Sequence, residues 1–256
     1  MTIKKYDAFC LDLDGTVYKG IEPIPEAVLF IKKLQDRGLD HYFVTNNASL
    51  TPTEVQMKLD SFGIKVSTNS VMTSAIAAAK YCQEHYGGAS VMMIGENGLE
   101  EALQSEGIQI NKKSPDVVVM GIDRNISYDK LADACLAIRA GAHFVATNSD
   151  KAIPTERGLV PGNGSFVKLV EYSTGVKPIY VGKPESHMLS YIQANGGYKK
   201  DKMVMIGDNY DTDILAGIRF GIDTIHVEGG VTSKEDLKVI EKQPTFLLRM
   251  LSEWRL

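Results

Sequence analysis

The sequence has few cysteines, and their positions do not suggest a zinc site or a disulfide framework. Only Cys10, Cys82 and Cys135 occur among 256 residues, far apart and odd in number. No C-x-x-C pair and no cysteine–histidine cluster with zinc-ligand spacing is present. We therefore expect three buried or half-buried thiols in a reducing compartment.

Long apolar runs and concentrations of positive charge are also missing. No apolar stretch approaches the roughly 18 residues that a membrane-spanning helix needs. The net charge is -4 and the lysines and arginines are scattered, whereas a nucleic-acid-binding protein usually carries a basic stripe. We therefore expect no membrane or nucleic-acid partner, and we predict a cytoplasmic location.

Several common catalytic motifs are absent as well. The glycine-rich stretch at 162–164 lacks the Lys-Ser/Thr ending of a P-loop, and the stretch at 95–98 is typical of a strand-to-helix turn. No G-x-S-x-G nucleophile elbow occurs, and the five histidines show no paired spacing. A nucleotide-binding P-loop and a Ser-His-Asp hydrolase are therefore not supported.

What the chain does contain is a regular alternation of short apolar strands and amphipathic helices. Such alternation predicts an α/β fold with a doubly wound parallel sheet and helices on both faces. The glycine- and proline-rich region at 150–163 is expected to be an extended loop. Strands are expected in the segment before Gly15 and at 41–44, 90–94, 117–121, 144–147, 179–181, 203–206 and 224–227, and helices near 25–37, 52–62, 74–86, 98–106, 128–140, 165–172, 185–194, 212–220 and 244–254.

Two carboxylates stand two residues apart where the first predicted strand ends. In extended backbone, Asp12 and Asp14 share a face, so their charges repel at close range. An apolar strand carries them into a site rather than onto an exposed surface, and Mg²⁺, which prefers oxygen ligands, is the natural counter-charge. The pair therefore indicates a magnesium-assisted site.

Other polar residues follow other predicted strands. Thr45 comes after 41–44, Lys183 after 179–181 and Asp208 after 203–206. Taken singly these signals are weak, because Thr-Asn-Asn is a common turn and an isolated lysine is usually solvated. In open parallel sheets, however, ligands bind beyond the carboxyl ends of the strands, so one shared site is expected.

These residues resemble the four signatures of the haloacid dehalogenase-like phosphatases. The run Asp12-Leu13-Asp14-Gly15-Thr16 resembles the first signature, and Thr45, Lys183 and Gly207-Asp208 resemble the other three in the right order. Only about 30 residues separate Asp14 from Thr45, whereas about 137 separate Thr45 from Lys183. The surplus implies an inserted α/β cap domain at 88–178 between core segments 1–87 and 179–256, an arrangement similar to the NagD-like group.

The resemblance implies a role for each site residue. Asp12 would be the nucleophile and Asp14 the acid and base, and Mg²⁺ would be held by Asp12, Asp208 and the backbone carbonyl of Asp14. Asp213 would lie behind the metal, orienting Lys183 or a metal-bound water. The remaining phosphate oxygens would be held by Thr45, Asn46, Asn47 and Lys183, and the cap residues Asn148 and Asp150 would face the substrate.

The same resemblance implies a phosphoric monoester hydrolase that acts on small metabolites, as a monomer or homodimer. Phosphorylated sugars or acid sugars are favoured, with nucleoside monophosphates and pyridoxal phosphate as alternatives. A phosphomutase of this superfamily usually carries its cap earlier in the chain, and a dehalogenase does not need Asp14. A non-catalytic metabolite-binding protein on the same fold remains an alternative of another class, although Asp12, Asp14, Lys183 and Asp208 are all present.

Overall fold

Two units, each built on its own parallel β-sheet, make up the chain in the computed structural model, which describes residues 5–111, 113–155 and 157–256. Unit 1 comprises the described residues up to Thr45 together with Thr53–Met72 and Lys183–Leu256, and unit 2 comprises Asn46–Pro52 and Thr73–Gly182. The insertion predicted at 88–178 lies within unit 2, which also takes in 73–87 and 179–182. Residues 1–4 of the predicted core lie outside the described residues.

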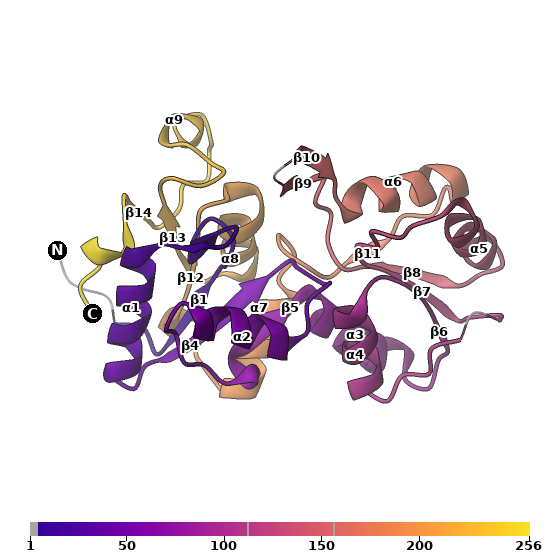
Figure 1. Cartoon of the computed structure of the whole chain (residues 1–256), viewed down its shortest axis with the longest axis horizontal. Coiled ribbons are helices and arrows are strands. Elements are labelled where there is room, and N and C mark those ends of the chain that lie inside the picture. Colours follow the sequence, from indigo (N-terminus) through magenta and orange to yellow (C-terminus); the bar gives the residue numbers. More distant parts are fainter. Residues whose placement is uncertain (1–4, 112, 156) are drawn as a thin grey trace. The chain divides into compact units, whose positions relative to one another are not determined.

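The sheet of unit 1 has six strands in the order β14-β13-β12-β1-β4-β5 (Figure 1). Neighbours from β14 to β4 run parallel, as predicted for a doubly wound sheet. The two central strands are buried along their whole length, which explains their unbroken apolar sequences. The strands are β1 (Ala8–Leu11), β4 (Asp40–Thr45), β5 (Val71–Thr73), β12 (Met203–Gly207), β13 (Asp223–Val227) and β14 (Phe246–Leu248).

Helices cover both faces of this sheet. Phe9 of β1 packs edge-on against Phe30 of α1, and its register partner Val204 on β12 points to the same face. The next residue of β12, Met205, points the other way and meets α8 at Gly217. The elements around the sheet are β2 (Tyr18–Lys19), β3 (Glu22–Pro23), α1 (Pro25–Asp36), α2 (Pro52–Ser61), η1 (Thr68–Ser70), α7 (His187–Gly196), η2 (Lys200–Lys202), the π-helical turn η3 (Tyr210–Ile214), α8 (Leu215–Phe220), α9 (Lys234–Leu237) and η4 (Leu251–Glu253).

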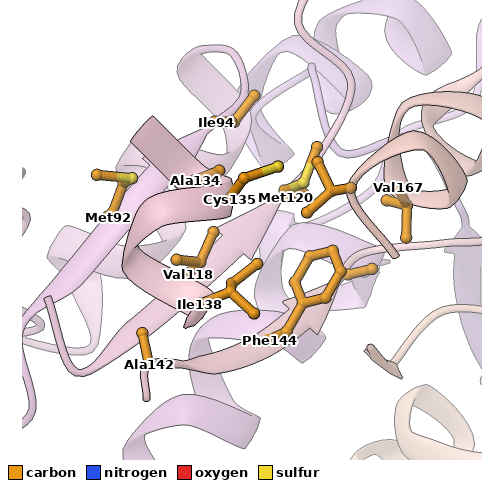
Figure 2. Close-up of a cluster of buried hydrophobic side chains, with 12 residues drawn as sticks. Met92, Ile94, Val118, Met120, Ala134, Cys135, Ile138, Ala142, Phe144 and Val167 are labelled. Carbon is orange, nitrogen blue, oxygen red and sulfur yellow. The ribbon is translucent and has the colours of Figure 1, made fainter. Parts of the chain in front are cut away.

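Unit 2 has a four-stranded parallel sheet in the order β11-β8-β7-β6. Alternate residues of three strands, such as Met92, Val118 and Phe144, pack beneath α5 and α6 in the cluster that Figure 2 shows. Because side chains alternate across a strand, Val117 and Val119 point to the opposite face of the sheet, and α3 also contacts β7. The elements are α3 (Ser74–Tyr86), β6 (Val91–Ile94), α4 (Asn97–Ser105), β7 (Val117–Met120), α5 (Tyr128–Arg139), β8 (His143–Ala146), β9 (Ala152–Thr155), β10 (Gly158–Pro161), α6 (Asn163–Thr174) and β11 (Ile179–Tyr180).

Two sequence-based predictions of local structure are wrong. The expected loop at 150–163 contains an antiparallel hairpin of β9 and β10, with Gly158 at a φ of 106° beside the turn. Both strands carry a proline, which a two-stranded ribbon tolerates because each strand has a free edge. The expected helix at 244–254 is instead the edge strand β14 followed by η4, since Thr224 and Thr245 exchange backbone-to-hydroxyl hydrogen bonds of 3.0 Å that align β14 with β13.

The cysteines agree with expectation. Cys10, Cys82 and Cys135 are free and buried, as predicted. None of the helices in the described parts of the chain combines the length and the apolar character that crossing a bilayer requires.

Candidate active site

The nucleophile candidate Asp12 lies where β1 ends, between the ends of its two neighbours. Its backbone N–H donates to the carbonyl of Ile206 on β12 at 2.9 Å, which continues the parallel ladder by one residue. The residue is only 8% exposed. The chain then turns at Gly15, whose φ of 93° favours glycine and where a Cβ atom would overlap the Asp208 carboxylate. The turn thus brings Asp208 against the loop that carries Asp12 and Asp14.

A buried lysine lies at the centre of this site. The Nζ of Lys183 is 2.5 Å from Oδ1 of Asp12 and 2.7 Å from Oδ1 of Asp213, and it donates to the carbonyl of Val44 at 2.8 Å. Burial opposes the charge of Lys183, but Asp12 and Asp213 outweigh that effect and raise its pKa. Lys183 is therefore a permanent cation that links the ends of β1, β4 and the loop after β12.

Asp208 is held in place on both of its carboxylate oxygens. Thr16 donates to Oδ1 at 2.9 Å, and the backbone N–H of Val231 donates to Oδ2 at 2.7 Å. The backbone carbonyl of Asp208 accepts from Thr232 and lies 3.0 Å from Nε2 of the fully buried His226. These bonds orient the carboxylate before any ligand arrives. The sequence predicts no contact with Asp208 for Thr16, His226 or Val231, because only the tertiary structure brings them to it.

The side chains of Asp12, Asp208 and Asp213 converge closely enough to share one metal ion. One carboxylate oxygen from each lies within 4.8 Å of the others, and all three residues are buried. Burial, together with the charge of Asp213, raises the pKa values of Asp12 and Asp208, although Lys183 acts in the opposite direction on Asp12 and the hydrogen bonds from Val231 and Thr16 do so on Asp208. One lysine cannot balance three ionised carboxylates, and an all-oxygen donor set suits Mg²⁺. The residues present therefore fit a divalent cation.

This cluster differs in membership from the predicted ligand set. Asp213, expected behind the metal, bonds to Lys183 and also contributes an oxygen to the cluster, while its orienting role remains a prediction. Its own carboxylate is aimed by the backbone N–H of Asn209, which donates to Oδ2 at 3.0 Å. Asp14 is not among the clustered side chains, and the part predicted for its backbone carbonyl remains a prediction.

The carboxyl of Asp14 faces a different set of neighbours. Asp14 is exposed at its surface, yet partial desolvation by the surrounding loop raises the pKa of its carboxyl, while Lys58, the hydroxyl of Tyr18 and Lys183 act in the opposite direction. A raised pKa keeps a carboxylic acid able to give up a proton nearer to neutral pH. The acid and base role predicted for Asp14 remains a prediction.

The remaining predicted residues lie at the end of β4 and in unit 2. Thr45 is the buried last residue of β4. Asn46 donates to Oδ1 of Asp150 at 3.1 Å, and Asn148 donates to the Asn46 carbonyl at 2.8 Å and accepts from the Asp150 N–H at 3.1 Å. Unit 2 thus brings Asn46, Asn148 and Asp150 together, and the polar atoms of Asn148 bind backbone.

Asn47 adopts the common turn that its sequence context allows. Its side-chain oxygen accepts from the backbone N–H and the hydroxyl of Ser49, both at 2.9 Å, and from the N–H of Leu50 at 3.2 Å. This geometry stabilises the chain just before α2. The phosphate-binding role predicted for Asn47 remains a prediction.

Comparison with known proteins places this geometry in a family. The haloacid dehalogenase-like hydrolase family matches residues 9–109, and a related HAD-hydrolase-like family matches 180–254. The chain belongs to the haloacid dehalogenase-like hydrolases, and its relatives are consistent with the NagD-like phosphatases. Neither family match covers 110–179, a stretch inside unit 2.

Individual relatives are similar along nearly the whole chain. The "5'-nucleotidase YutF" of Bacillus subtilis is 46% identical over 98% of this chain and 98% of its own. An "acid sugar phosphatase" of Staphylococcus epidermidis is 45% identical over 98% and 97%. The structure of a thermostable NPPase from Geobacillus stearothermophilus matches with a TM-score of 0.94 at 43% identity, covering 99% of both chains. This chain is accordingly a phosphoric monoester hydrolase by class.

Proposed function

We propose that this protein is a Mg²⁺-dependent phosphatase that transfers the phosphoryl group of small phosphate monoesters to Asp12 and then to water. The buried convergence of Asp12, Asp208 and Asp213 around Lys183 carries the proposal. Such a cluster is costly without a cation, and its location at the carboxyl ends of β1 and β12 is where ligands of parallel sheets bind. A cytoplasmic location remains part of the proposal.

The chemistry assigned to the protein's own residues proceeds in two displacements. A carboxylate oxygen of Asp12 attacks phosphorus, and the P–O bond to the alcohol breaks while Asp14 gives that oxygen a proton. In the second displacement Asp14 takes a proton from a water molecule while the oxygen of that water attacks phosphorus. The bond between phosphorus and Asp12 breaks, and inorganic phosphate is released. A bound Mg²⁺ supplies charge neutralisation between nucleophile and phosphate.

Several residues are assigned to binding rather than to bond making. Lys183 holds Asp12 and neutralises phosphate charge, while Thr45, Asn46 and Asn47 are proposed to hold phosphate oxygens. Unit 2 is proposed to be the cap, with Asn148 and Asp150 facing the rest of the substrate. The uninterrupted 73–182 segment of unit 2 and the family matches on either side of 110–179 support this division.

The substrate class is proposed to be sugar or acid-sugar phosphates. The relative named acid sugar phosphatase supports this choice, while the 46% identical relative named 5'-nucleotidase favours nucleoside monophosphates as a second candidate. Ranking both classes by kcat/KM decides between them. Preference for nucleoside monophosphates by more than about tenfold, which corresponds to roughly 1.4 kcal/mol, would reverse the order.

The test of the reaction itself uses p-nitrophenyl phosphate. Asp12→Asn should lower turnover by about 10³-fold or more, and chelation of divalent cations should silence the native enzyme until Mg²⁺ is restored. A matched Tm would show that the variant is folded. Normal turnover by folded Asp12→Asn protein would refute the assignment of the nucleophile, and turnover that survives chelation would refute the metal requirement.

A further inference from the structure

His226 is a fully buried histidine that takes no part in the two displacements. It lies on β13, next to Gly207 of β12 in the parallel register. Its Nε2 is 3.0 Å from the backbone carbonyl oxygen of Asp208. A carbonyl oxygen only accepts hydrogen bonds, so Nε2 carries a hydrogen and donates it. The other ring nitrogen, Nδ1, has no hydrogen-bond partner among the residues that the structure describes.

The unpaired Nδ1 makes histidine an unfavourable residue for the interior of this sheet. A buried nitrogen that has lost its hydrogen bonds to water and gained none from the protein lowers stability. An apolar side chain at this position would carry no such penalty. What the imidazole contributes is therefore the hydrogen bond from Nε2 to Asp208.

The carbonyl of Asp208 is held by two donors. It accepts from Nε2 of His226 and, at 3.1 Å, from the backbone N–H of Thr232. A carbonyl oxygen has two lone pairs, so both are engaged. The direction of this carbonyl is therefore set jointly by β13 and by the loop that follows β13.

That direction also determines how the next peptide group meets the carboxylate cluster. The Asp208 carbonyl and the Asn209 N–H belong to one planar peptide unit, in which they point in opposite directions and turn together. The Asn209 N–H donates to Oδ2 of Asp213 at 3.0 Å. Gly207 leaves the space that Asp213 fills, because a Cβ atom on Gly207 would overlap its carboxylate. One peptide unit thus connects the imidazole to two of the three clustered aspartates.

We propose that His226 is a positioning residue that presets Asp208 and Asp213 for a divalent cation by fixing the peptide unit between residues 208 and 209. This inference rests on the Mg²⁺ site of the proposed function. Without the imidazole donor, Thr232 alone holds the carbonyl, and the peptide unit is freer to tilt. Tilting moves the backbone from which the Asp208 carboxylate extends and weakens the hydrogen bond that aims Asp213. The clustered oxygens then match a cation less well, so affinity for Mg²⁺ falls.

The experiment compares the Kd of Mg²⁺ for the native protein and for variants of His226. The Kd is obtained from the rise of the urea unfolding midpoint across a Mg²⁺ titration, so it does not depend on turnover. His226→Leu removes the donor, and we expect the Kd to rise about 10- to 100-fold, as for other losses of a partner behind a metal ligand. A purely structural role would lower the midpoint and leave the Kd unchanged.

Glutamine and asparagine separate the reach of the donor from its polarity. The amide nitrogen of glutamine lies the same number of bonds from Cα as Nε2 of histidine, so His226→Gln should keep the Kd within about threefold of the native value. His226→Asn carries the same amide on a shorter side chain, which places its nitrogen near the position of Nδ1. Its Kd should therefore rise as in His226→Leu. This pair also decides the question if the leucine variant folds poorly.

Thr224→Val provides the matched control. Thr224 lies two residues before His226 on the same face of β13 and is also fully buried. Its hydroxyl accepts from the backbone N–H of Thr245 at 3.0 Å, so the bond that is lost joins β13 to the segment before β14. The variant should have a lower unfolding midpoint and an unchanged Kd for Mg²⁺.

The outcomes distinguish failure of the inference from failure of the proposed metal site. A native Kd in both His226→Leu and His226→Asn would overturn the inference. An equal rise of the Kd in His226→Gln or in Thr224→Val would also overturn it, because the effect would then come from packing alone. If Mg²⁺ does not stabilise the native protein, or stabilises Asp208→Asn equally, the metal site itself fails and the inference fails with it.

Discussion

The two units use the same architecture but end their strands in different chemistry. In unit 1, β1 and β12 lead directly to Asp12 and Asp208, and buried charges meet around Lys183. In unit 2, β8 leads to Thr147 and Asn148, which are neutral. A parallel sheet offers its carboxyl edge in both cases, and the residue types placed there decide what that edge can do.

In unit 2 a neutral side-chain amide links the segments at the strand edge by hydrogen bonds from its nitrogen, while its buried oxygen, Oδ1 of Asn163, has no hydrogen-bond partner among the described residues. The Nδ2 of Asn163, a 1% exposed residue at the start of α6, donates to Met120 O at 3.2 Å, Thr147 Oγ1 at 3.3 Å and Asn148 O at 3.1 Å. This single amide fixes the loop after β8. The carboxylates of unit 1 instead keep an excess of negative charge, which is the feature that identifies a reactive site.

Replacing Lys183, the buried cation of unit 1, should lower activity and stability more than any other change considered for the two strand edges. Lys183→Met leaves three carboxylates without their counter-charge, so we expect turnover to fall by about 10³-fold and the free energy of unfolding to fall by about 3–5 kcal/mol. Chemical denaturation without divalent cations measures the second quantity. A variant as stable as the native protein would show that the carboxylates of the cluster are already protonated or well compensated.

Magnesium should stabilise unit 1 through the carboxylate cluster. At a concentration 100 times the Kd, Mg²⁺ should add about 2.7 kcal/mol to the native free energy of unfolding, and Asp208→Asn should remove most of that gain. Thermal or urea unfolding with and without Mg²⁺ measures the gain.

Asp123→Asn is the control for the magnesium experiment. Asp123 is another buried aspartate, 4% exposed, whose carboxylate pairs with Lys130 in unit 2 at 2.6 Å. Its replacement should cost stability but leave the gain from Mg²⁺ intact. An equal loss of that gain in both variants would show that the metal does not bind at the predicted cluster.

The smallest effect on the free energy of unfolding is expected from a substitution in the neutral hydrogen-bond network of unit 2. Asn163→Ala removes the three hydrogen bonds of one amide, and we expect a loss of about 1–3 kcal/mol in the free energy of unfolding because buried acceptors are left unpaired. The gain from Mg²⁺ should remain, since the network holds no charge. If Asn163→Ala lowered the free energy of unfolding as much as Lys183→Met, the charged edge of unit 1 and the neutral edge of unit 2 would not differ in the way described.

Much of the fold followed from local pattern. The apolar runs of β1 and β12 and the helical spacing of α1 identify buried elements without any tertiary information, because a strand buried on both faces must be apolar throughout. The hairpin of β9 and β10 is exposed and contains Pro154 and Pro161, so composition predicted a loop. β14 was predicted as a helix because a short apolar run does not distinguish the two structures, and its pairing with β13 decides the outcome.

For the site, the sequence by itself determined that carboxylates and a lysine follow separate buried strands, since strand ends can be recognised locally. Only the tertiary structure decided that Asp213 meets both Lys183 and the other carboxylates, and that Thr16 and Val231 hold Asp208. Those contacts depend on strand register and on turns that bring together residues distant in the chain. No local pattern encodes such distances, because they arise only when the whole sheet is assembled.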